Sequence, residues 1–226
     1  MVARWAAGQP GARIWERPDA IAVACANLSR RDRLAIHGEP EAVARLLSDE
    51  VLANIKNTYR PIGAEEVIVS VAELIPGFEV DGKFGWMDVT APVPAAKTSA
   101  TWLHPDELPR VAALIEQAFP DSYAKPGAPG VERWAGIRGD DGTLLAVAAD
   151  AWSTAEIGLL AGVATRPEAR GRGLARQLCA FVTNELLAGR ERVGLMVDYW
   201  NVGALNTYAK LGFDLKRVAA ARLNEC

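Results

Sequence analysis

The order of apolar patterns in residues 98–226 constrains the fold more than any other feature of this chain. Apolar residues spaced three and four apart alternate with short apolar runs, which predicts the order α, β, β, β, α, β, α, β. The segments are 105–119, 131–138, 143–152, 156–165, 174–187, 193–200, 201–212 and 213–223. This alternation predicts an α/β (α+β) fold in which helices flank a mixed sheet.

The first part of the chain is patterned differently. Residues 20–27 and 33–38 read as a hairpin, and residues 39–57 carry the spacing of an amphipathic helix. A mixed apolar run, EVIVSVAELIP, follows, and in FEVDGKFGWMDV the pair Asp81-Gly82 indicates a second hairpin. Pro and small residues then fill 91–100, which we interpret as a linker. We therefore predict a smaller α/β domain over residues 1–97 and a second domain over 98–226.

Composition excludes several classes of protein. The chain has 226 residues, 50% hydrophobic and 23% charged, so it is not a disordered polymer. A net charge of -3 gives no global attraction for nucleic acid or for a membrane surface, and we expect neither as a partner. The start lacks the apolar block of a signal peptide, and no segment has the apolar length of a membrane span. We expect a soluble, cytoplasmic protein.

No metal site is expected. The three cysteines, Cys25, Cys179 and Cys226, lie far apart and form neither a disulfide framework nor a thiolate ligand set. His37 and His104 are isolated from each other and have no acidic residue at ligand spacing.

The chemistry is concentrated in one segment, RPEARGRGLA, at residues 166–175, between an apolar run and an amphipathic helix. Glycines let main-chain N–H groups converge, and the N-terminus of the next helix adds unpaired donors and a positive dipole end. Arg166, Arg170, Arg172 and Arg176 add charge suited to phosphate. The segment therefore predicts a pyrophosphate site, the alternative being an ordinary tight turn with solvated arginines.

Two common phosphate motifs do not fit this segment. The P-loop pattern G-x-x-x-x-G-K-[ST] is absent, and a dinucleotide fingerprint would need Gly or Ala where Arg176 stands. The loop must therefore serve another nucleotide.

The segment resembles the pyrophosphate loop of the GNAT superfamily of acyl-CoA-dependent N-acyltransferases, R/Q-x-x-G-x-G/A. The matching residues are Arg170, Gly171, Arg172, Gly173, Leu174 and Ala175. A second signature, N-x-x-A-x-x-x-Y-x-K-L-G-F, is matched by Asn201, Ala204, Tyr208 and the run from Lys210 to Phe213. Within the superfamily, GVATRPEARGRGLA is most similar to the glycine N-acyltransferase-like branch, although Ala169 departs from the aromatic residue often found there.

The resemblance covers residues 98–226 and implies acetyl-CoA or another short acyl-CoA as co-substrate. The Arg170–Ala175 loop would bind its pyrophosphate, and main-chain groups of Val163 and Thr165 would bind the pantetheine arm. Asn201 would bond the same arm or cap its helix. Most members have one more strand after the position where this chain ends, so either an N-terminal element or a second subunit, as in a homodimer, would complete that sheet edge.

The resemblance also implies catalytic roles. Tyr208 would protonate or hydrogen-bond the leaving thiolate. Glu156 is the candidate base, but 14 residues separate it from Arg170, so a bulge would have to absorb the extra length of the strand. A water-mediated route is the other option. We expect direct acyl transfer to a primary amine, on a small molecule or a peptide; the alternative function is a non-catalytic acyl-CoA-binding regulatory or scaffolding module.

Overall fold

The computed structural model describes residues 1–94 and 98–224, so part of the expected linker and Cys226 lie outside the described residues. The chain forms two compact units. The first contains residues 1–86, 197–200 and 216–226, and the second contains residues 87–196 and 201–215. The predicted division at residue 97 differs from these units, because the last strand of the chain belongs to the first unit.

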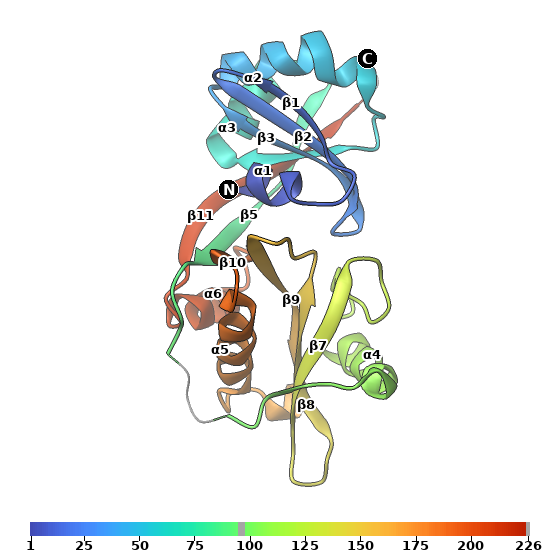
Figure 1. Cartoon of the computed structure of the whole chain (residues 1–226), viewed down its shortest axis with the longest axis vertical. Helices are drawn as coiled ribbons and strands as arrows, with labels where there is room; N and C mark the ends of the chain where they lie inside the picture. The colour runs from blue at the N-terminus through green and yellow to red at the C-terminus, as the bar shows by residue number, and fades with distance from the viewer. Residues whose placement is uncertain (95–97, 225–226) are drawn as a thin grey trace. The chain divides into compact units, whose positions relative to one another are not determined.

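The first unit is a sheet with strand order β1-β2-β3-β4-β11-β5, with helices on both faces (Figure 1). In β3, Leu34 and Ile36 pack in one core with Val43 and Ile68 of α2 and α3. Because side chains alternate along a strand, their neighbours face the other side, where α1 packs. The bounds are α1 (Val2–Ala7), β1 (Arg13–Arg17), β2 (Ala20–Leu28), β3 (Arg31–Gly38), α2 (Pro40–Leu46), β4 (Arg60–Ala64), α3 (Glu65–Leu74), β5 (Phe78–Val89) and β11 (Asp214–Leu223).

Two of the predictions for this unit are confirmed. Strands β2 and β3 pair antiparallel as the expected hairpin. The helical pattern of residues 39–57 forms α2, which continues as a π-helical turn over Leu47–Val51 and a 3-10 turn over Leu52–Asn54. The run EVIVSVAELIP, left as mixed, is largely the helix α3.

The hairpin expected at Asp81-Gly82 is wrong. Phe78–Val89 is one uninterrupted strand, β5. Asp-Gly forms a hairpin turn when both central residues take positive φ, and Gly82 is not among the positive-φ glycines of the described chain. The exposed Asp81 and the half-buried Gly82 instead stay extended within β5.

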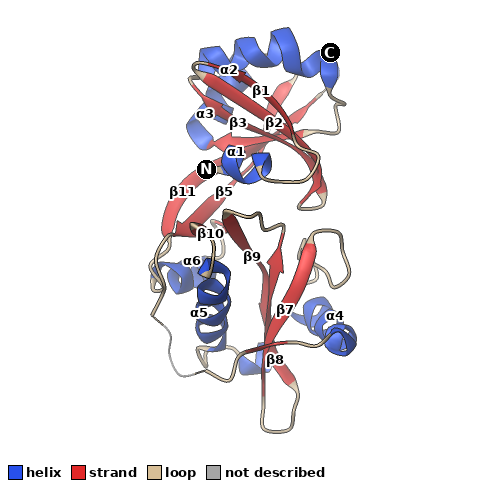
Figure 2. Cartoon of the chain, viewed as in Figure 1, coloured by secondary structure: helices blue, strands red, loops and turns tan. Residues whose placement is uncertain are grey.

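The chain from residue 98 to 223 follows the predicted order of helices and strands, preceded by a short strand β6, and all but the last strand, β11, belong to the second unit. Its strands lie in the order β5-β10-β9-β8-β7-β6, where β5 contributes its last residues, and α4 and α5 flank the sheet (Figure 2). The bounds are β6 (Thr101–Trp102), α4 (Leu108–Ala118), β7 (Val131–Arg138), β8 (Leu144–Ala151), β9 (Ile157–Thr165), α5 (Leu174–Leu187), β10 (Arg192–Asp198) and α6 (Val202–Ala209).

Side-chain alternation assigns the faces of this sheet. Arg133 of β7 stacks on Trp102, and Trp102 packs on Phe181 of α5, so these side chains are on the α5 face. The next residue, Trp134, therefore lies on the α4 face. Its register partners Ala149 in β8 and, beyond it, Ala161 in β9 lie on the same face.

Strands β9 and β10 are parallel but pair only at their beginnings. The recorded pairs run from Arg192 with Ile157 to Gly194 with Leu159, while β9 continues to Thr165. Beyond Leu159, the edge of β9 that faces β10 is outside this ladder.

Strand β5 takes part in both units. Its neighbours in the strand order are β11 and β10. An element from the N-terminal part of the chain, β5, thus lies beside the last strand β11, which is one of the two options expected for that sheet edge.

Candidate functional site

The loop between β9 and α5 has the backbone geometry of an anion site. Gly171 and Gly173 take positive φ, +77° and +74°, and a Cβ added at either would meet nothing within 4 Å. Gly173 is the N-cap of α5 and no side chain caps that helix end. The first main-chain bond of α5 joins Gln177 N–H to Gly173 C=O, so the preceding N–H groups are available to a ligand. No acidic residue lies in the first turn to compete for them.

The four arginines of the segment divide into two pairs. Arg166 donates to Leu144 O (2.6 Å) and to Gln117 Oε1 (2.8 Å), and Arg170 donates to Thr165 O and Ala118 O (3.3 Å each). These two side chains fasten the loop to its own unit. Arg172 and Arg176 are exposed and have no hydrogen bond or ion pair within the described part of the chain. The charge available to a phosphate is therefore that of Arg172 and Arg176.

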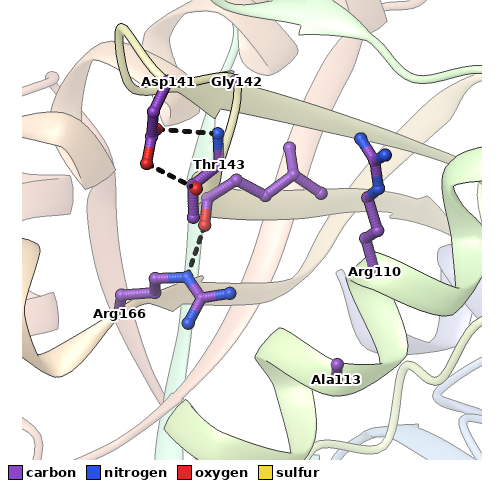
Figure 3. Close-up of a pocket in the computed structure, with 7 residues that line it drawn as sticks. Arg110, Ala113, Asp141, Gly142, Thr143 and Arg166 are labelled. Atoms are coloured by element: carbon purple, nitrogen blue, oxygen red, sulfur yellow. Dashed lines mark hydrogen bonds between the residues drawn. The ribbon is translucent and has the colours of Figure 1, made fainter.

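Arg166 also faces a pocket of about 340 Å³ (Figure 3). Arg110 from α4 lies on the opposite side of this pocket, and the turn between β7 and β8 forms its rim. Within that turn, Asp141 accepts bonds from the Thr143 N–H (3.0 Å) and hydroxyl (2.8 Å), so this carboxylate is already satisfied by its own turn. The pocket is distinct from the α5 N-terminus.

Strand β9 contains the bulge that the sequence interval required. Ala164 pairs with Val147 and Ala161 with Ala149, so one extra residue lies on β9 between them, and Gly162 has φ +60°. Val163, the expected main-chain contact for pantetheine, lies in this bulge. Thr165 lies at the strand end, where its carbonyl already accepts the Arg170 bond.

Tyr208 is buried in the second unit, 7% exposed, on α6. Its ring packs near Phe213 (centroids 6.0 Å apart). Burial raises the pKa of Tyr208 well above 10, and the charge of the Cys179 thiolate raises it further. Burial likewise raises the pKa of Cys179 to about 12. At neutral pH Tyr208 is therefore a neutral hydrogen-bond donor.

Asn201 begins α6 as its N-cap. Its Oδ1 accepts a bond from Ala204 N–H (3.1 Å), so the capping option is confirmed and the side-chain amide N–H₂ remains the group for a ligand. The preceding Trp200 is 76% exposed.

Glu156 is not on β9. It is exposed, precedes the strand, and its carbonyl accepts a bond from Glu191 N–H (3.0 Å) where β9 and β10 are still paired. The bulge absorbs one residue, but nine strand residues still separate Glu156 from the loop end. The structure thus brings Glu156 to the end of β9 opposite the loop, away from the part that has left β10.

Sequence reasoning missed the residue beneath the bulge. A Cβ added at Gly162 would lie 2.6 Å from Cη2 of Trp134 and 3.1 Å from Cβ of Ala124. Trp134 is 2% exposed, and within the described chain its indole N–H has no hydrogen-bond partner. The alanines of β8 are the signal that could have indicated a large ring lying across this strand.

Among residues 1–94 and 98–224, no group of three or more His, Cys, Asp or Glu side chains is arranged to hold a metal ion. None of the described helices combines the length and the apolar character that a membrane span requires.

Comparison with known proteins adds a family match and a fold. A family model described as FR47-like protein matches residues 136–222. No curated protein matches the chain. A GCN5-related N-acetyltransferase from Kribbella flavida has a TM-score of 0.70 at 17% identity, covering 100% of this chain and 96% of that one.

Two other solved structures share the fold. A GCN5-related N-acetyltransferase from Sphaerobacter thermophilus matches with TM-score 0.60, 18% identity and coverage of 90% and 76%. A GNAT-family acetyltransferase from Colwellia psychrerythraea matches with TM-score 0.58, 14% identity and coverage of 90% and 81%. The fold is therefore that of these GCN5-related N-acetyltransferases, and the FR47-like match lies within it.

Proposed function

We propose that this protein is an acyl-CoA-dependent N-acyltransferase that moves an acetyl or other short acyl group to a primary amine. One observation carries the proposal: β9 separates from β10 after Leu159, and the loop that follows β9, with two left-handed glycines, leads into the uncapped N-terminus of α5. The strand supplies main-chain partners for an extended amide-bearing arm, and the helix end supplies donors for a pyrophosphate.

The residues fit acyl-CoA as the co-substrate. Main-chain N–H groups from Gly171 to Ala175 would bind the pyrophosphate, and Arg172 and Arg176 would add charge. Of the two strand residues expected to bind pantetheine, Val163 in the bulge is better placed than Thr165, whose carbonyl is engaged by Arg170. Asn201 would use its amide N–H₂ toward the same arm while its oxygen caps α6.

The reaction is direct transfer in a ternary complex. The neutral amine attacks the thioester carbonyl carbon, a C–N bond forms, the C–S bond breaks, and the amine loses the proton that the thiolate ultimately needs. Tyr208 is the proposed donor to that thiolate, because its raised pKa keeps the phenol protonated. Glu156 is exposed just before β9, at the end of the strand farthest from the loop, which favours a water-mediated route for the amine proton.

The superfamily resemblance and the fold likeness to several acetyltransferases support this function class. The finer assignment to the glycine N-acyltransferase-like branch remains a proposal based on the residues around the loop. A non-catalytic acyl-CoA-binding module remains the alternative function, and the placement of Glu156 is the observation in its favour.

The test combines binding with turnover. Calorimetry with CoA and acetyl-CoA measures the first step, and a thiol reagent detects CoA released when amines, amino acids and peptides are supplied. We expect acetyl-CoA binding and thiol release with one amine class. Binding without turnover on any class would favour the module, and the absence of binding would overturn both functions.

A further inference from the structure

We infer that Trp134 limits the length of the acyl group that this protein accepts, by filling the space beneath the β9 bulge. The inference rests on the proposed function and specifies its donor: an acyl-CoA whose chain is no longer than about acetyl or propionyl. Trp134 lies in β7, two strands from β9, so the sequence around the loop does not indicate that Trp134 limits the acyl group.

The position of the thioester follows from lengths along β9. The pyrophosphate site at the start of α5 follows Thr165 after a short loop. An extended pantetheine arm is about as long as five residues of strand, roughly 16 Å. Laid antiparallel to β9 from its C-terminal end, the arm therefore brings the sulfur close to residues 161–163, which is where the bulge lies.

The bulge would offer space to an acyl chain if Trp134 were absent. Gly162 has no side chain, and Ala161 and Ala149 on the same face are small. The indole occupies this volume: its six-membered ring comes within 2.6 Å of the position a Gly162 Cβ would take, and Ala124 closes the other side. The Trp134 side chain is 2% exposed, so its ring fills the space under the bulge.

Packing contacts hold the Trp134 indole in place. Its N–H is buried and has no hydrogen-bond partner among residues 1–94 and 98–224, so packing against β8, β9 and Ala124 fixes the ring. A smaller apolar side chain can therefore replace it without leaving a polar partner unpaired. The exchange would open volume next to the thioester while leaving the loop and α5 unchanged.

The experiment measures dissociation constants of acetyl-, butyryl- and hexanoyl-CoA by calorimetry, so no acceptor is needed. The variants are Trp134→Leu and the milder Trp134→Phe. The control is Ile137→Ala, which truncates a buried residue of the same strand on the opposite, α5 face. Each methylene that enters apolar surroundings tightens binding about fourfold, so the two extra methylenes of butyryl should raise the butyryl-to-acetyl affinity ratio of Trp134→Leu by about 16-fold. Trp134→Phe should shift it less, and Ile137→Ala should not shift it.

The outcomes separate the two proposals. If the wild type binds none of the acyl-CoAs, the proposed function fails and the inference with it. If acetyl-CoA binds and folded Trp134 variants weaken all three ligands equally, or keep the wild-type ratio, Trp134 is only structural and the inference is overturned. Should Trp134→Leu fail to fold, the ratio for Trp134→Phe decides.

Discussion

A matched pair of glycine substitutions tests whether the α5 N-terminus binds CoA. Gly173 precedes α5 with φ +74°, and Gly189 follows the same helix with φ +87°. A Cβ at either position would meet nothing within 4 Å. Valine at both sites therefore imposes the same kind of strain, an L-residue in the left-handed region, without a clash.

The magnitudes of the two effects differ. The left-handed conformation costs about 1–2 kcal/mol, and somewhat more for a β-branched residue, so both variants should lose similar unfolding free energy. Only Gly173→Val also blocks or tilts main-chain donors toward the pyrophosphate. One hydrogen bond to a charged group is worth about 1.5–3 kcal/mol, which corresponds to about a 10- to 150-fold loss of CoA affinity.

The assay is calorimetry of CoA binding, with thermal unfolding of each variant as the measure of strain. We expect Gly189→Val to bind CoA as the wild type does, with a melting temperature lowered like that of Gly173→Val. Unchanged affinity in a folded Gly173→Val protein would refute the assignment of this helix end. Equal losses in both variants would show that helix strain, and not the loss of donors, governs binding.

Three active-site or core changes and one truncation extend these tests. Tyr208→Phe keeps the ring and removes the donor, so kcat should fall about 100-fold or more while acyl-CoA affinity stays constant. Glu156→Gln should keep near wild-type turnover, because this side chain is exposed at the far end of β9; a 100-fold loss would restore it as the base. Burial raises the pKa of Cys179 from 9.0 to about 12, so the unfolded state releases its proton first and stability falls as pH rises from 9 to 12, by about 1.4 kcal/mol per unit. Cys179→Ala should therefore lessen the fall of the urea unfolding free energy between pH 9 and 11 by about this slope. A fragment of residues 98–226 should be poorly soluble and lack cooperative unfolding, as judged by circular dichroism, because it lacks β4 and β5.

The loop and the order of elements were predictable from sequence because their signals are local. Glycine needs no tertiary contact to adopt positive φ, and the apolar spacing around Gly173 marks both the strand before it and the helix after it. Which groups each arginine side chain bonds was not predictable from the sequence. Arg166 and Arg170 resemble phosphate ligands in sequence, yet they bond carbonyl oxygens and a side chain brought near by α4 and β8.

The position of the candidate base Glu156 could not be predicted for a similar reason. A bulge was expected in β9 and is present, but the number of residues before it could not be counted from the sequence, because the start of β9 is set by its pairing with β10 at Ile157. The same limit hid Trp134: its contact with Gly162 crosses β8 and depends on the register of three strands.

The sharing of β5 explains why the two compact units do not divide at residue 97. A linker rich in Pro and small residues normally separates domains, but here the strand before it belongs to both units. Asp88 near the end of β5 is 2% exposed and pairs with Arg192 of β10 (2.6 Å). At the other end of the chain, Val218 to Ala220 of β11 pair with Ile62 to Ala64 of β4. A cut at the linker would therefore separate the buried Asp88 carboxylate from Arg192 and leave unpaired strand edges in both pieces, so we expect neither piece to fold as an independent domain.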